Sequence, residues 1–307
     1  MSVFTSLIFL TACSYKPQFS KAFDYGVVYG EDNRSNTALN EVLNHNPELS
    51  LEEAKMLLEM GRATAGMVEL GKHVKKKSDG SIVPIKELGT LLEKRELCTG
   101  ENFEDEYVLP VCSGFLVGPD LLVTAGHCVD RENYKNKVWL FGYDSSFAFD
   151  PNPTFSPDHV YFTKEVVLWE KNSYSYKDYA LVRLDRKVLG VNPYKIRTTG
   201  KAEKGSLLAI IGHPSGLTTK ISSGGAKILD ASEEVRIKTN VDSFAGNSGS
   251  PVINIKTGKV EGILVSGAED YISTDREDDY CNKVNAREEK EGEEYITRIS
   301  LVASKIP

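Results

Sequence analysis

Short apolar runs separated by turn residues dominate the chain from about residue 62 onward. They cover residues 65–70, 113–117, 121–125, 138–141, 160–162, 166–169, 179–184, 207–211, 235–238, 251–255 and 260–265. Gly, Pro, Asn and Asp stand between them, and these residues favour turns. Many short strands at this spacing are typical of an all-β barrel or sandwich.

The pattern before residue 62 is different. Residues 39–43 have apolar positions at helical spacing, and Ser50 and Glu53 form a capping-box pattern before a second apolar stripe. We therefore expect a partly helical N-terminal extension over residues 14–61, whose apolar stripe serves packing, followed by the barrel region over residues 62–307.

Composition excludes some partners. The 307 residues are 40% hydrophobic and 26% charged, with a formal net charge of −7. The one lysine run, 75–77, leads into a Ser-Asp-Gly turn, so we expect no nucleic acid as a partner. The acidic stretch 268–295 is expected to be a solvated loop.

The N-terminus carries an export pattern. Residues 3–10 are mostly apolar but too few to span a bilayer, which suits a signal peptide. Leu10-Thr-Ala-Cys13 then resembles a bacterial lipobox, which implies a signal peptide over residues 1–12 and a lipid on Cys13 as the one membrane attachment. The first twelve residues contain no Lys or Arg, so a plain cleaved signal or a buried strand stays open.

A polar glycine-rich turn offers a candidate nucleophile. It reads Gly246-Asn-Ser-Gly-Ser-Pro251, with Ser248 at its centre. A serine hydroxyl needs a base to take its proton and fixed donors for the oxyanion that it creates. An uninvolved turn would have the same composition, so partners elsewhere must decide. The nucleophile elbow of α/β-hydrolases does not fit, because Ser250 replaces its second glycine.

Of the five histidines, His127 is the candidate base. It ends the apolar run Leu121-Leu-Val-Thr-Ala-Gly-His and is followed by Cys128. A core histidine or a zinc ligand is the alternative, although the chain lacks the paired Cys-x-x-Cys spacing that zinc favours.

A carboxylate should orient that histidine. Asp178 opens the alternating strand Asp-Tyr-Ala-Leu-Val-Arg-Leu184 and is the favoured candidate. Asp185 at the other end of this strand is a weaker alternative, followed by Asp150 and Asp158 in a proline-rich loop.

Together these three motifs resemble the trypsin/chymotrypsin superfamily of serine proteases. Thr-Ala-Gly-His-Cys, Asp-Tyr-Ala-Leu and Gly-Asn-Ser-Gly-Ser-Pro occur in the order His, Asp, Ser of that family and are most similar to its bacterial glutamyl-endopeptidase-like branch. The resemblance implies two packed six-stranded antiparallel β-barrels with a cleft between them.

The resemblance also implies roles for individual residues. Ser248 would be the nucleophile, His127 the base and Asp178 its orienting acid, with the N–H groups of Gly246 and Ser248 as the oxyanion hole. The family pattern further implies a Cys112–Cys128 bridge beside the histidine. Cys98 and Cys281 are then left for a second bridge, although four cysteines allow three pairings.

The loop departs from trypsin in ways that bear on specificity. Asn247 replaces the aspartate that receives a new N-terminus in trypsin, so we expect no such activation. Asp242 falls where trypsin has the acid that pairs with substrate Arg or Lys, although a surface turn carboxylate is the alternative. Phe244 replaces a bridging cysteine, and cleavage after Glu stays open.

The sequence thus predicts an exported, monomeric serine endopeptidase that acts on protein or peptide substrates and needs no cofactor or metal. The alternative is a non-catalytic binding or adhesion lipoprotein on the same scaffold.

Overall fold

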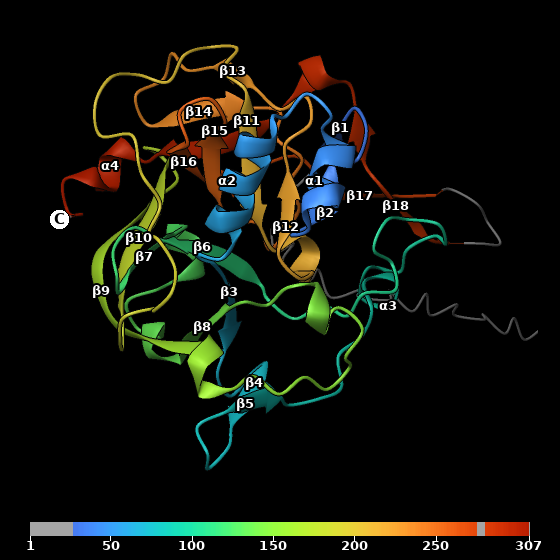
Figure 1. The fold of residues 1–307 in the computed structure, drawn as a ribbon, viewed down its shortest axis with the longest axis vertical. Coiled ribbons are helices and arrows are strands. Elements are labelled where there is room, and N and C mark those ends of the chain that lie inside the picture. Colours follow the sequence, from blue (N-terminus) through green and yellow to red (C-terminus); the bar gives the residue numbers. More distant parts are fainter. Residues whose placement is uncertain (1–26, 275–279, 307) are drawn as a thin grey trace, which may run out of the picture.

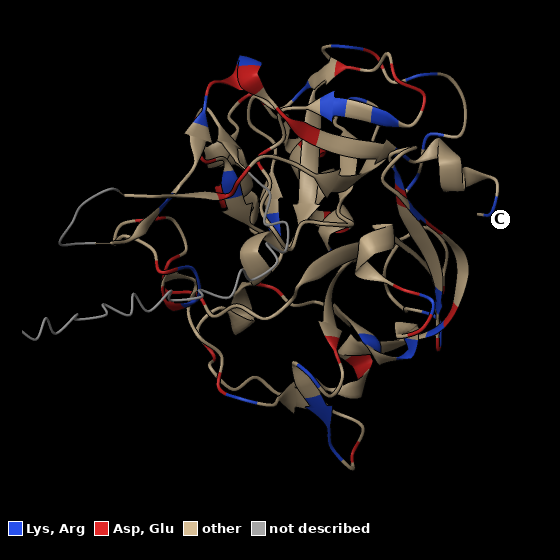
Figure 2. Ribbon diagram, turned by 180° about the vertical axis from the view of Figure 1, so that it is seen from behind, with Lys and Arg blue, Asp and Glu red and all other residues tan. Residues whose placement is uncertain are grey.

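Two β-structures pack against each other in the computed structural model, which describes residues 27–274 and 280–306 (Figure 1). The expected signal peptide and Cys13 lie outside the described residues. Within them, the helices are too short or too polar to cross a membrane. Acidic and basic residues are interspersed over the strands and loops (Figure 2).

The first β-structure is a closed antiparallel barrel with the strand order β10-β7-β6-β3-β8-β9. Its strands are β3 (Thr64–Glu69), β6 (Cys112–Leu116), β7 (Leu121–Thr124), β8 (Lys137–Phe141), β9 (Val160–Asn172) and β10 (Lys177–Leu184). The runs at 160–162 and 166–169 form one long strand, and its ladder with β10 is irregular near residues 181–184. Such irregularities increase the bend that closes a barrel.

The second β-structure is a sheet of eight strands with the order β13-β14-β20-β16-β15-β11-β12-β2. The strands are β2 (Arg34–Asn36), β11 (Leu208–Gly212), β12 (Lys220–Ser222), β13 (Ile228–Asp230), β14 (Arg236–Thr239), β15 (Pro251–Asn254), β16 (Lys259–Ser266) and β20 (Glu294–Arg298). Leu208 N–H donates to Ala226 O and Ile228 N–H to Ser206 O, each over about 3 Å, and these bonds join β13 back to the start of β11. Six of the strands thus curl into a second barrel, and β12 and β2 extend it.

Strands correct the expectation of a loop over the whole of 268–295: Tyr271–Ser273, Asn282–Val284 and Ala286–Arg287 are extended, and β20 begins at Glu294. The β20 sequence Glu-Tyr-Ile-Thr-Arg has few apolar residues, yet Glu294 is fully buried. Buried polar side chains need partners from elsewhere in the fold, so the hydropathy pattern could not reveal this strand.

Short elements decorate the barrels. They are β1 (Val28–Tyr29) paired with β19 (Ala286–Arg287), β4 (Val74–Lys76) with β5 (Ile82–Pro84), β17 (Tyr271–Ser273) with β18 (Asn282–Val284), and the helix α3 (Leu91–Arg95). The hairpin of β4 and β5 projects from the first barrel (Figure 1).

Both predicted N-terminal helices are present, as α1 (Leu39–His45) and α2 (Leu51–Gly61). The capping box of α2 is confirmed: Glu53 N–H donates to Ser50 Oγ at 3.2 Å, and Ser50 N–H donates to Glu53 Oε2 at 2.9 Å. Helix α2 contacts β11 and β12. Because β2 also pairs with β12, residues 34–61 pack along the extension of the second barrel. The last helix, α4 (Ser300–Ala303), contacts β10 of the first barrel.

Candidate active site

His127 and Asp178 meet at the edge of the first barrel. His127 follows β7 in a single 3-10 turn over Gly126–Cys128, and Asp178 lies at the start of β10, which pairs with β7. The Asp178 carboxylate accepts two hydrogen bonds from His127, at 2.9 Å from the backbone N–H to Oδ1 and at 2.8 Å between Nδ1 and Oδ2. With this bond at Nδ1, the proton lies on the Asp178 side of the ring and Nε2 is left as the basic nitrogen.

The turn that carries His127 requires glycine at position 126. A Cβ there would lie 2.2 Å from Glu170 O and 3.0 Å from Asp178 Oδ1. The Trp169 indole N–H donates to Gly126 O at 2.9 Å, which ties the turn to β9. The glycine of Thr-Ala-Gly-His-Cys is thus needed for the close approach of β9 and β10.

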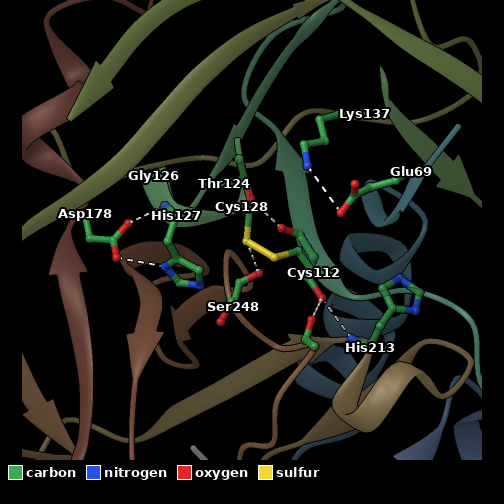
Figure 3. The surroundings of a disulfide bond; sticks show 12 residues. Glu69, Cys112, Thr124, Gly126, His127, Cys128, Lys137, Asp178, His213 and Ser248 are labelled. Carbon is green, nitrogen blue, oxygen red and sulfur yellow. Dashed lines mark hydrogen bonds and ion pairs between the residues drawn. A yellow bond between two sulfur atoms is a disulfide. The ribbon is translucent and has the colours of Figure 1, made fainter. Parts of the chain in front are cut away.

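Ser248 lies beside the imidazole of His127, on the side away from Asp178 (Figure 3). It comes from the turn before β15 of the second barrel, so the three candidate residues come from both barrels. Among the described residues, Ser248 Oγ forms no hydrogen bond with His127. Such bonds are often long in enzymes without bound substrate and tighten in the substrate complex.

The turn that carries Ser248 has two backbone N–H groups without an acceptor among the described residues. The N–H groups of Ala245, Asn247, Gly249 and Ser250 donate to Asp270 Oδ2, Phe244 O, Leu264 O and Asn247 O. Within the described residues, the N–H groups of Gly246 and Ser248 donate to nothing. An oxyanion hole needs such unsatisfied donors on a rigid backbone.

The first barrel holds this turn in place. Ser113 N–H donates to Ser248 O at 2.8 Å, and Ser113 Oγ donates to Gly246 O at 2.7 Å. Gly249 has φ +91°, and a Cβ on it would lie 2.1 Å from Ser113 O. Sequence reasoning missed Ser113, whose only signal is a hydroxyl within the apolar run after Cys112.

The two disulfides join the pairs of cysteines that were expected. Cys112 is bonded to Cys128, and Cys98 to Cys281. Cys128 Sγ lies 3.5 Å from Ser248 O. Because an oxidised sulfur carries no proton, this is a packing contact rather than a hydrogen bond, and it brings the bridge against the turn of Ser248 (Figure 3).

The bridge also bears on metal binding. In the described part of the chain, Cys112, His127 and Cys128 group their ligand atoms within 4.8 Å of one another. Zinc takes cysteine as a thiolate, whereas both sulfurs here are bonded to each other. These residues therefore do not fit a zinc site.

His213 is buried behind the turn and has a structural position. Its backbone N–H donates to Ser113 Oγ at 3.0 Å, and its ring Nδ1 lies 3.1 Å from Leu217 O. Burial lowers the pKa of His213 to about 4. The ring is therefore neutral at physiological pH.

Asp242, expected to bind substrate, holds the N-terminal segment. Its side chain is buried and accepts Tyr29 N–H at 2.8 Å and Asn33 N–H at 3.2 Å. Burial is the main reason that the pKa of Asp242 is raised to about 7. The Arg34 guanidinium lies beside it, 4.0 Å from the centre of the Phe244 ring.

A second buried acid, Glu294, lies close to this segment. It accepts hydrogen bonds from Ser243 Oγ and from Ala268 N–H, the latter at 3.1 Å, and burial raises its pKa well above the usual range. A Cβ on Gly267 would lie 1.9 Å from Glu294 Oε2. This acid therefore fills the space beside the end of β16, a position that its sequence context did not suggest.

Comparison with known proteins agrees with this fold. Residues 112–263 match the family model of the trypsin-like peptidase domain. A glutamyl endopeptidase of Bacillus licheniformis is 26% identical over 147 residues, which are 46% of this chain and 44% of the relative. An extracellular metalloprotease of Bacillus subtilis is 27% identical over 151 residues, 46% of this chain and 45% of the relative. The chain thus spans less than half the length of these curated relatives.

Solved structures of proteases are also similar. A Glu endopeptidase in complex with MPD has a TM-score of 0.43 and 16% identity, over 78% of this chain and 94% of that one. The VesB protease of Vibrio cholerae has a TM-score of 0.47 and 12% identity, over 80% of this chain and 63% of that one.

The matched region contains His127, Asp178 and Ser248, and it runs from the first barrel into the second. Residues 112–263 therefore form a trypsin-like peptidase domain, and the chain is similar to the trypsin/chymotrypsin-like proteases, including a glutamyl endopeptidase.

Proposed function

We propose that this protein is a serine endopeptidase with the triad Ser248, His127 and Asp178. Ser248 Oγ attacks the scissile carbonyl while His127 Nε2 takes its proton. The same imidazolium then protonates the leaving amine, and water repeats the cycle on the acyl-enzyme. Asp178 keeps the ring in the required tautomer and stabilises its positive charge.

The backbone of the turn supplies the remaining element. The free N–H groups of Gly246 and Ser248 would bind the oxyanion of the tetrahedral intermediate. One observation carries the proposal: the Asp178 carboxylate contacts both the backbone N–H and Nδ1 of His127, so the ring cannot rotate without losing a charged hydrogen bond.

A fluorophosphonate probe tests the assignment. It phosphonylates a serine only where a base and an oxyanion hole activate it. We expect labelling of Ser248 alone by peptide mapping, and none in the Ser248→Ala variant. Ser250→Ala is the matched control, because Ser250 lies in the same turn but its Oγ donates to Asn247 Oδ1. Labelling that persists in Ser248→Ala would refute the proposal, and a folded, oxidised protein without labelling would favour a binding scaffold.

Cleavage specificity stays a prediction. Cleavage after Arg or Lys would require Asp242 to exchange the N–H groups of Tyr29 and Asn33 for a substrate cation. The similarity to a glutamyl endopeptidase makes cleavage after Glu the alternative. Profiling of a peptide library, with wild type and Asp242→Asn compared, decides between them.

We also propose that the protein is exported. One relative is an extracellular enzyme, and two disulfides favour an oxidising compartment. Lipidation at Cys13 stays a prediction, which the mass of the purified protein's N-terminal peptide would test.

A further inference from the structure

A basic groove opens beside the candidate oxyanion hole. Its volume is about 500 Å³, and Ala245 and Gly246 are among the residues that line it. Residues 108–111, here called the groove wall, also line it, as does the turn at Ser215 and Gly216, which follows β11. Leu109 N–H donates to Gly216 O at 2.8 Å, so wall and turn are held together.

The charges around this groove are mostly positive. Lys72, Lys86, Lys94 and Arg95 line it, with Glu87 as the single acid. Lys72 pairs with Glu69 at 3.3 Å. Among the described residues, Lys86 and Lys94 form no ion pair, and both are exposed. The chain as a whole has a net charge of −7, so this local concentration of cations favours binding of an anionic ligand.

The groove lies on the side of the departing amine. His127 gives its proton to that amine, so the leaving half of a substrate lies on the side of His127 and the Cys112–Cys128 bridge. Cys112 is directly preceded by Val111, the end of the groove wall. A peptide bound across Ser248 therefore directs the residues that follow its scissile bond into the groove.

We infer that the protein prefers substrates with Asp or Glu in the first few positions after the scissile bond, and that Lys86 and Lys94 bind the carboxylates of these residues. The inference rests on the proposed protease activity and adds a substrate class to it. Exposed charge pairs are weak, so each lysine should raise kcat/KM about threefold for a substrate that it contacts.

Internally quenched peptides test the preference. They share one cleavage site and differ only in the three positions after it, which carry Asp or Asn. We expect the Asp peptide to have a kcat/KM several-fold higher, and this advantage to shrink in about 1 M salt, where charges are screened beyond about 3 Å. The double variant Lys86→Gln/Lys94→Gln should lose the advantage and keep its rate on the Asn peptide.

Lys75→Gln/Lys77→Gln is the control, because it removes the same charge from exposed lysines at the β4–β5 hairpin that do not line the groove (Figure 2). It should behave as wild type. Equal rates on both peptides, or an equal loss in the control variant, would each overturn the inference while leaving the protease assignment intact. Absence of both fluorophosphonate labelling and peptide cleavage would instead overturn the proposed function, and the inference with it.

Discussion

The substitution Asp178→Asn separates a catalytic role of this acid from a structural one. Asn has one acceptor oxygen in place of two. If that oxygen keeps the His127 backbone N–H at 2.9 Å, the amide NH₂ faces Nδ1 across the 2.8 Å contact. Nδ1 must then accept a hydrogen bond, so the ring proton moves to Nε2 and the nitrogen that faces Ser248 is no longer basic.

The expected cost follows from this change of tautomer. A triad with the wrong tautomer loses about 10⁴ in kcat, equivalent to about 5.4 kcal/mol of transition-state stabilisation. Stability should change far less, because the Asp178 side chain is 21% exposed and the Asn side chain has nearly the same shape.

The assay is the rate of fluorophosphonate labelling and of peptide cleavage, with thermal unfolding measured in parallel. Asp185→Asn is the matched control. That residue lies just beyond the other end of the same strand and accepts Phe162 N–H at 3.0 Å, far from His127 in register. It should keep nearly full activity.

Two outcomes would refute the reasoning. A loss of less than about tenfold in Asp178→Asn would show that His127 does not depend on this carboxylate for its tautomer. A comparable loss in Asp185→Asn would show that the effect comes from disturbing β10.

Three further predictions concern the scaffold. Gly249→Ala should destabilise the protein by about 3 kcal/mol or more, because its Cβ would lie 2.1 Å from Ser113 O at a φ of +91°. The control Gly71→Ala also has a positive φ, +82°, but its Cβ would meet no atom within 4 Å, so it should cost only about 1 kcal/mol by urea unfolding. The double Ser variant of Cys112 and Cys128, which are 16 residues apart, should lower the free energy of unfolding by about 3 kcal/mol, and an unchanged urea midpoint would contradict this. Asp242, with its pKa raised to about 7, holds a proton between about pH 4 and 7 that the unfolded chain has lost, so its contribution to stability falls as pH rises through that window. Relative to Asp242→Asn, wild type should therefore lose up to about 1.4 kcal/mol per pH unit there, and a constant difference between the two at pH 4.5, 6 and 8 would rule this out.

Local sequence determined the chemistry of the candidate site. Ser248 is set in a turn where Gly246 and Gly249 both have positive φ, a backbone conformation that glycine adopts at little cost. His127 follows the mostly apolar strand β7 by a few residues, and Asp178 lies at the start of the alternating strand β10. Turn chemistry and strand period depend on a few neighbouring residues, so the sequence alone predicts these motifs and the strands that carry them. The helix that begins after Ser50 was predictable for the same reason.

The tertiary structure decided everything that depends on residues distant in sequence. Asp242 is 213 residues from Tyr29, whose backbone N–H it accepts, and nothing in its own neighbourhood indicates that the N-terminal segment occupies it. The sequence around Glu294 predicts an acidic loop, but in the fold Glu294 is buried in β20 and accepts a hydrogen bond from Ser243 Oγ. The basic groove likewise brings together Lys86, Lys94 and Gly246, which come from the loop after β5, from α3 and from the turn before β15. Burial and charge proximity arise when the chain closes on itself, so a sequence identifies the reactive groups while the fold determines what surrounds them.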